Sequence, residues 1–103
     1  TPGAPLYSSA RAGANMLVRN VAAEVVDKGV QVNAIGTNFM DFPEFLKANR
    51  AEDPEGRARV EAMVPMGRLG KPEEIANTYA WLASDEASYV NGAVIEVSGG
   101  CTI

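Results

Sequence analysis

Near the start of the chain, apolar residues recur at intervals of three and four, which is the period of an α-helix. The repeat runs from position 6 to about 27, and the apolar stripe that it predicts contains Ala10, Ala14, Leu17, Val21 and Val25. The proline at position 5 suits the first turn, where its missing N–H costs nothing. A lysine followed by a glycine at 28–29 is a typical helix end, because a cation favours the negative pole and glycine can turn left-handed.

The rest of the pattern predicts two short strands separated by helices. Residues 30–35 and 93–97 are continuous apolar runs of strand length. Between them, prolines and apolar spacing predict helices at about 44–48, 53–63 and 72–83. Strands joined by a long helical crossover are expected to lie parallel, with a right-handed crossover, so the predicted fold class is α/β. The loop Gly36-Thr37-Asn38 would then lie at the carboxyl edge of the sheet, where open parallel sheets bind ligands.

Composition and charge exclude several function classes. The chain has 103 residues, 47% of them hydrophobic, which suits one packed domain. Its 9 basic and 13 acidic residues form no basic stripe, so neither nucleic acid nor a membrane is expected as a partner. The absence of histidine excludes Ser-His-Asp and Cys-His catalysis and most zinc sites, and no metal is expected. No secretory signal or membrane-length apolar run is visible, so we expect a cytoplasmic protein.

Two residues of the first helix carry candidate chemistry. Tyr7 and Arg11 are four positions apart, which places both side chains on one helical face. A guanidinium beside a phenol favours the phenolate, and such a tyrosine can serve as a general base. The same spacing also occurs where a tyrosine simply packs and an arginine is solvated, so the pair alone does not decide between these interpretations.

The order of several short blocks resembles the short-chain dehydrogenase/reductase family. After Tyr7 and Arg11 come Ala12-Gly13-Ala14, Val30-Gln-Val-Asn-Ala-Ile35, Gly67-Arg-Leu-Gly-Lys-Pro-Glu-Glu-Ile75, Trp81-Leu-Ala-Ser84, Tyr89-Val-Asn-Gly92 and Val97-Ser-Gly-Gly100. The resemblance covers nearly the whole chain. It implies the carboxyl-terminal part of a single Rossmann-like domain, with two strands of a doubly wound parallel sheet and their flanking helices. Residues 1–5 resemble a loop that enters a helix, so we expect a piece of a longer protein whose amino-terminal half is absent.

Two departures from the pattern resemble one branch of the family, the halohydrin dehalogenases. The family's oxidoreductases carry a lysine that holds the nicotinamide ribose where this chain has Arg11. They also have a Pro-Gly loop after the strand, where this chain has Asn38. The dehalogenases share the fold without using a nicotinamide, although they usually have proline where Thr37 stands. By this resemblance we expect no cofactor, with a halide ion as the bound product.

The resemblance also implies a mechanism. Tyr7, assisted by Arg11, takes the proton of a vicinal haloalcohol, and the alkoxide expels the halide to leave an epoxide. Small anions would open epoxides in the reverse direction. The residues implied for halide binding are Thr37, Asn38, Phe39 and Met40. Those implied for the wall of the substrate pocket are Phe42 and Phe45.

Two alternatives remain open on sequence grounds. One is an NAD(P)-dependent reductase of the same family that tolerates Arg11, and the other is a non-catalytic member that serves only to assemble. The family also uses a serine upstream of the tyrosine, and no serine precedes Tyr7 in this chain. The helices that contain Arg11 and Trp81 correspond to subunit contacts in the family, which implies a homotetramer. Because a strand at 30–35 would have an unpaired edge, we expect these residues to fold poorly without the amino-terminal half, which activity should also require.

Overall fold

The computed structural model describes residues 3–101, so Thr1 and Pro2 of the expected entry loop lie outside the described residues. Its elements follow the predicted order of helix, strand, helices and strand. In chain order they are α1 (Pro5–Val25), the 3₁₀ turn η1 (Val26–Lys28), β1 (Ala34–Thr37), α2 (Pro43–Ala48), α3 (Pro54–Glu61), α4 (Pro72–Leu82), the 3₁₀ turn η2 (Asp85–Ala87) and β2 (Val94–Val97).

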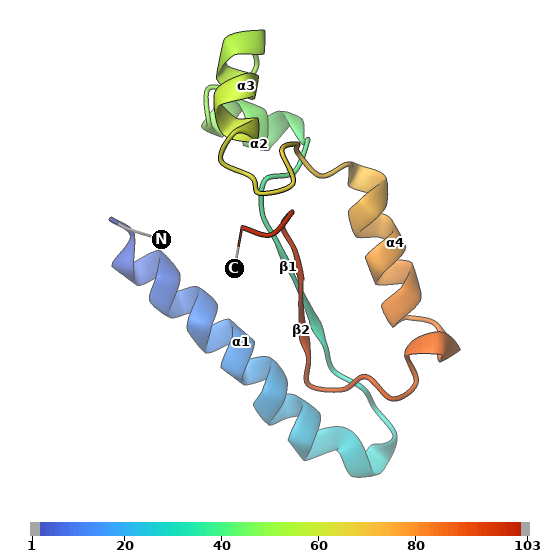
Figure 1. Cartoon of the computed structure of the whole chain (residues 1–103). Coiled ribbons are helices and arrows are strands. Elements are labelled where there is room, and N and C mark those ends of the chain that lie inside the picture. The colour runs from blue at the N-terminus through green and yellow to red at the C-terminus, as the bar shows by residue number, and fades with distance from the viewer. Residues whose placement is uncertain (1–2, 102–103) are drawn as a thin grey trace.

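The two strands form a parallel sheet with a helix on each side, as Figure 1 shows. Ala34 pairs with Val94, and the register continues to Thr37 opposite Val97. Helix α1 runs along one side of the strands and α4 along the other, while α2 and α3 lie together beyond the carboxyl end of β1 (Figure 1). This arrangement confirms the α/β fold class and the parallel pairing.

The first strand begins later than its apolar run predicts. The expected bounds of 30–35 are wrong, because β1 spans Ala34–Thr37. The amide side chains of Gln31 and Asn33 donate hydrogen bonds to the Val90 carbonyl at 2.7 and 2.9 Å, in place of a backbone ladder. The segment before β1 is therefore held mainly by side-chain hydrogen bonds, together with one backbone bond from the Gly92 N–H to the Val32 carbonyl at 2.8 Å.

The first helix ends as predicted but buries a different stripe. Gly29 adopts φ 72°, and its N–H donates to the Val26 carbonyl at 3.1 Å. Toward the sheet, the more deeply covered apolar side chains are Val18, Val21, Ala22 and Val25, all in the second half of α1. The predicted stripe is wrong in its first half, where Ala10, Ala14 and Leu17 are exposed. The described sheet covers only the later turns of this helix.

The described residues bury little apolar surface for their size. A small core of Ala51, Val60 and Leu69 lies between α2 and α3, with three partly buried residues against it. The accessible area is 7286 Å², whereas a compact monomer of this mass exposes about 5,600 Å². The radius of gyration is 15.9 Å, compared with about 13 Å for a compact domain of this length. Large apolar side chains remain exposed on several elements, among them Leu6, Met16, Leu17, Met63, Met66, Tyr79 and Tyr89.

Two features of residues 3–101 bear on the wider function. None of the helices in this range combines the length and the apolar character that crossing a membrane requires. Within the same range, no three or more histidine, cysteine, aspartate or glutamate side chains gather closely enough to hold a metal ion.

Candidate active site

The carboxyl ends of the strands border a depression of about 330 Å³ beside the first turns of α1. This edge of a parallel sheet is where ligands bind in open α/β folds. The polar residues that line the depression are Tyr7, Ser8, Arg11 and Asn15 from α1, Thr37 from the end of β1, Asn38 just beyond it, and Glu96 from β2. We call this depression the Tyr7 site.

Tyr7 and Arg11 share one helical face, as their spacing predicts. The Arg11 guanidinium carbon lies 6.0 Å from the centre of the Tyr7 ring, at the outer limit of a cation–π contact. Tyr7 is 59% exposed, so its phenol is accessible to a ligand in the depression. The pair therefore offers a proton-carrying oxygen and a fixed positive charge on the same side of the site.

The chain turns sharply after β1. Gly36 and Thr37, which were expected in a loop, belong to the strand, and only Asn38 lies beyond it. The Asn38 N–H donates to the Val97 carbonyl at 3.4 Å, and the Asn38 Oδ1 accepts from the Phe39 N–H at 2.9 Å. Phe39 adopts φ 54°, a left-handed conformation that is uncommon for a bulky residue. This turn sends the following segment away from the Tyr7 site.

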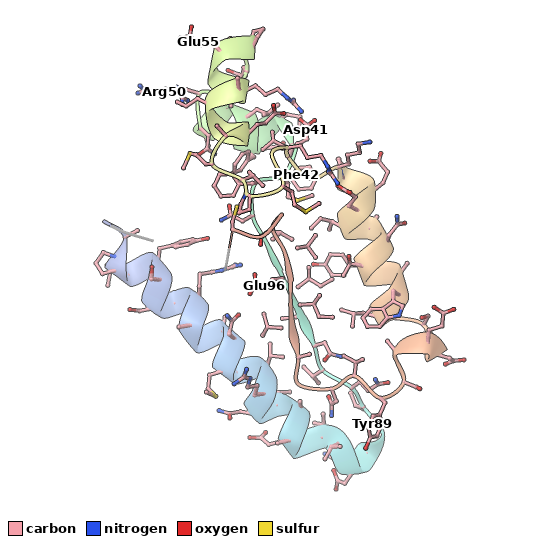
Figure 2. All side chains as sticks on the ribbon, in the orientation of Figure 1. Asp41, Phe42, Arg50, Glu55, Tyr89 and Glu96 are labelled. Atoms are coloured by element: carbon pink, nitrogen blue, oxygen red, sulfur yellow. The ribbon has the colours of Figure 1, made fainter. Side chains whose placement is uncertain are left out.

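The remaining residues expected at the site lie elsewhere. Phe39 packs edge-on against Phe45 with ring centres 5.7 Å apart, beside the small core. Met40 is 3% exposed and forms a parallel bridge with Gly70. The Phe42 N–H donates to the Met40 carbonyl at 2.9 Å, and Phe42 immediately precedes α2 (Figure 2). Of the eight residues expected at the site, the structure brings together only Tyr7, Arg11, Thr37 and Asn38.

Sequence reasoning missed three polar residues of the Tyr7 site. Ser8 directly follows Tyr7 on α1. Asn15 lies one helical turn after Arg11, so the same spacing that paired Arg11 with Tyr7 indicates it. Glu96 is the only charged residue of its strand and is flanked by apolar neighbours, which is a visible anomaly in an apolar run. Its proximity to Tyr7 depends on the pairing register, which the sequence does not show.

A second depression, of about 430 Å³, lies between the end of β2 and the start of α4. Arg68 and Glu74 border it and form a bidentate pair, with nitrogen–oxygen distances of 2.9 and 2.7 Å. The Arg68 hydrogen bonds and the Lys71 backbone N–H lower the pKa of Glu74 to about 2. Arg68 also donates to the Leu69 carbonyl at 3.1 Å. These charges pair with each other and with the loop before α4, which indicates a structural role.

A second ion network fixes the segment after the Phe39 turn. Arg57 of α3 donates to both carboxylate oxygens of Asp41, at 3.1 and 2.8 Å, and its Nε donates to Glu61 at 3.0 Å. The hydrogen bond from Arg57 lowers the pKa of Asp41. Burial raises the pKa of the Cys101 thiol, which opposes thiolate reactivity. None of these groups borders the Tyr7 site.

Comparison with known proteins places the chain in a family. The family described as enoyl-(acyl carrier protein) reductase matches residues 1–102. The chain is 45% identical to 3beta-hydroxysteroid dehydrogenase 1 of Eggerthella lenta, over 94% of this chain and 36% of that protein. It is 40% identical to the 3-oxoacyl-[acyl-carrier-protein] reductase FabG of Escherichia coli, over 91% of this chain and 37% of that protein. A solved structure of a dehalogenation enzyme superposes with TM-score 0.78 and 39% identity, over 92% of this chain and 39% of that one.

These comparisons overturn one expectation. A site without a cofactor is wrong, because the matching family and the similar curated proteins are reductases and dehydrogenases. Such enzymes need a hydride donor or acceptor, which points to a nicotinamide cofactor. The chain spans little more than a third of the length of these relatives. Its match over residues 1–102, together with its parallel α/β fold, shows that the chain belongs to the enoyl-(acyl carrier protein) reductase family of short-chain dehydrogenases/reductases.

Proposed function

We propose that this protein is a nicotinamide-dependent oxidoreductase that interconverts an alcohol and the corresponding carbonyl compound. The observation that carries the proposal is the exposed Tyr7 phenol beside Arg11, on a depression at the carboxyl edge of a parallel sheet. The hydroxysteroid dehydrogenase and the 3-oxoacyl reductase among the similar proteins support the same reaction class.

In this proposal Tyr7 is the general acid during reduction and the general base during oxidation. During reduction its phenolic oxygen gives a proton to the carbonyl oxygen of the substrate, and during oxidation it takes the proton of the alcohol. The phenolate that remains after reduction is stabilised by the positive charge of Arg11. The nicotinamide cofactor, when bound, supplies or accepts the hydride.

The residues of the Tyr7 site fit such a cofactor. Arg11 would hold it through guanidinium N–H donors, in the place where family members use a lysine, and the exposed Thr37 would contribute its hydroxyl at the strand end. Asn38 stands where the family's oxidoreductases have a Pro-Gly loop. Its Oδ1 accepts the N–H of the next residue, so the side chain is tied to its own loop.

Dehalogenation is the second candidate function, favoured by the likeness to a dehalogenation enzyme and by arginine in place of the family lysine. Tyr7 would take the proton of a haloalcohol, and Thr37 and Asn38 would contact the departing halide. The N–H groups of Asn38 and Phe39 already donate within the protein, to the Val97 carbonyl and to Asn38 Oδ1. Because fewer amides remain for an anion, we place this function second.

One assay on the product of the complete gene separates the two candidates. NADH or NADPH oxidation is followed with a panel of ketones, and halide release is followed with chloro- and bromoalcohols. We expect turnover of the nicotinamide with at least one ketone, and a loss of about 10²- to 10⁴-fold in the Tyr7→Phe variant. Arg11→Lys is the matched control, because it keeps the charge and restores the family residue. Halide release with no nicotinamide turnover would overturn the oxidoreductase proposal in favour of the dehalogenase.

We also propose that the protein assembles as a homotetramer. Leu6, Met16 and Leu17 of α1 are exposed, as are Tyr79 and Trp81 of α4, so both helices present apolar surface that subunit contacts would cover. Sedimentation of the complete gene product tests this assembly, and a monomer at micromolar concentration would contradict it.

A further inference from the structure

The second depression, of about 430 Å³, has walls that come from segments far apart in the sequence. On one side Met66 is tied to the end of β2, because its N–H donates to the Gly99 carbonyl at 3.1 Å. On another side Met40 lies against Gly70, where an added Cβ would be 2.7 Å from the Met40 sulfur. The first turns of α4 close the third side. The volume suits a small-molecule site, and we call it the Ser98 depression.

Ser98, which directly follows β2, is a buried polar residue whose side chain has no partner. It is 6% exposed, and its hydroxyl forms no hydrogen bond with another residue of the described range 3–101. Every side-chain nitrogen or oxygen that is fully buried in that range does have a partner. The Ser98 oxygen is therefore open to a small space, and the depression is the open space that this residue borders. A hydroxyl in this position can donate a hydrogen bond to a ligand and accept one from it.

The rest of the lining favours a ligand that is neutral and mostly apolar. Three side chains supply apolar surface: Met40, Met66 and Val97. Arg68 and Glu74 offset each other's charge through two hydrogen bonds. Glu96, the remaining charged residue of the border, forms no ion pair within the described residues, so it repels anions from the depression. A ligand with a carboxylate or phosphate group is therefore disfavoured, whereas a hydroxyl or carbonyl group can bind at Ser98.

The Ser98 depression and the Tyr7 site are neighbours. Both are bordered by Asn38 and Glu96, which lie at the carboxyl ends of the two strands. The two strand ends are joined there, because the Asn38 N–H donates to the Val97 carbonyl at 3.4 Å. A molecule longer than the Tyr7 site can therefore extend across this shared border into the Ser98 depression.

We propose that the Ser98 depression binds the far end of the substrate whose alcohol or carbonyl group reacts at Tyr7. The substrate class is a neutral, mostly apolar ketone or secondary alcohol that carries a second oxygen, as a hydroxyl or carbonyl group, at its far end. The Ser98 hydroxyl bonds that second oxygen, and Met40 and Met66 contact the apolar part. This inference rests on the proposed function for the reaction at Tyr7, and it adds a substrate class to that function.

The test follows binding without turnover, by NMR of the complete gene product with methyl-labelled methionines and no nicotinamide. The probes are straight-chain methyl ketones of increasing length, each with and without a terminal hydroxyl group. We expect saturable shifts in the signals of Met40 and Met66, and none for Met63, which does not border the depression. At the length that reaches Ser98, the hydroxy ketone should bind about three- to tenfold more tightly than its parent ketone, the scale of one hydrogen bond between neutral groups.

Ser98→Ala should remove this preference for the hydroxy ketone. Ser88→Ala is the matched control, because Ser88 is exposed and borders neither the Ser98 depression nor the Tyr7 site. In turnover with NADH or NADPH, the loss of preference in Ser98→Ala should appear in KM rather than in kcat, since the lost contact lies away from the reacting carbon.

Equal affinity for every hydroxy ketone and its parent overturns the proposal, and this comparison on the unaltered protein remains readable if Ser98→Ala fails to fold. A preference that persists in Ser98→Ala also overturns it. Shifts at Met40 and Met66 without an effect on KM would show a ligand bound apart from the substrate, which overturns it as well. Ketone turnover with no shift at Met66 would refute this site and keep the oxidoreductase. A preference that Ser98→Ala removes, without any nicotinamide turnover, would keep the site and refute the proposed reaction.

Discussion

Residues 1–103 expressed alone are predicted not to form a cooperatively folded monomer. They expose 7286 Å², which exceeds the surface of a compact monomer of the same mass by about 1,700 Å². With the usual apolar share of a protein surface, about 1,000 Å² of that excess is apolar. At about 25 cal/mol per Å², leaving this apolar area uncovered loses up to about 25 kcal/mol of hydrophobic stabilisation. A folded domain is stable by only about 5–15 kcal/mol, so the uncovered surface outweighs the whole margin.

The assay is urea unfolding of this segment, followed by far-ultraviolet circular dichroism, with dye binding and sedimentation velocity on the same sample. We expect a broad, non-cooperative loss of signal, strong binding of a hydrophobic dye, and association that increases with concentration. The complete gene product in the same buffer is the control and should unfold in one sharp transition. A monomeric segment with a sigmoidal curve and an m-value of about 1–3 kcal/mol/M would refute the area argument.

Two further predictions concern local stability in the complete gene product. Gly56→Ala should cost about 1–3 kcal/mol in urea unfolding, because its Cβ would collide with the Arg50 carbonyl oxygen; an unchanged free energy of unfolding would contradict this reasoning. Glu74→Gln should reduce the loss of melting temperature that the protein shows as the pH falls. The pKa of Glu74 is lowered from 4.5 to about 2, so its contribution is complete above pH 4.5 and is lost as pH falls toward 2. Melting temperatures of both proteins across that window test this, and parallel curves would exclude the Arg68–Glu74 pair as the cause.

Local signals in the sequence predicted local features well. Gly29 ends the first helical segment in a left-handed conformation, as its position after a lysine indicates. Asp53 caps α3 by accepting the Gly56 N–H at 3.1 Å, as the sequence Asp53-Pro54 predicts. The bounds of β1 failed because the amides of Gln31 and Asn33 substitute for ladder bonds, and an apolar count does not register side-chain hydrogen bonds to a distant loop.

The residues of the candidate site were likewise predictable where a local signal places them, and were missed where the path of the chain or the strand register places them. Tyr7 and Arg11 were predictable together because one helix places them, and Asn38 because it follows a strand. Phe39 was misplaced because a left-handed residue reverses the direction of the chain, and a phenylalanine carries no signal for that conformation. Glu96 was missed because its contribution depends on which residues of the other strand it faces.

The cofactor was misjudged for a related reason. Arginine in place of lysine and asparagine in place of a loop glycine each remove a familiar residue, and together they suggested that the nicotinamide had been lost. Arg11 nevertheless keeps the positive charge beside Tyr7, and the Asn38 side chain is occupied by the Phe39 N–H. A residue that departs from a family pattern indicates a new function only if its side chain is free to act in the site. In this protein the backbone N–H groups of Asn38 and Phe39 already donate within the chain, so the departure at the strand end weakens the argument for an anion site rather than the argument for a nicotinamide.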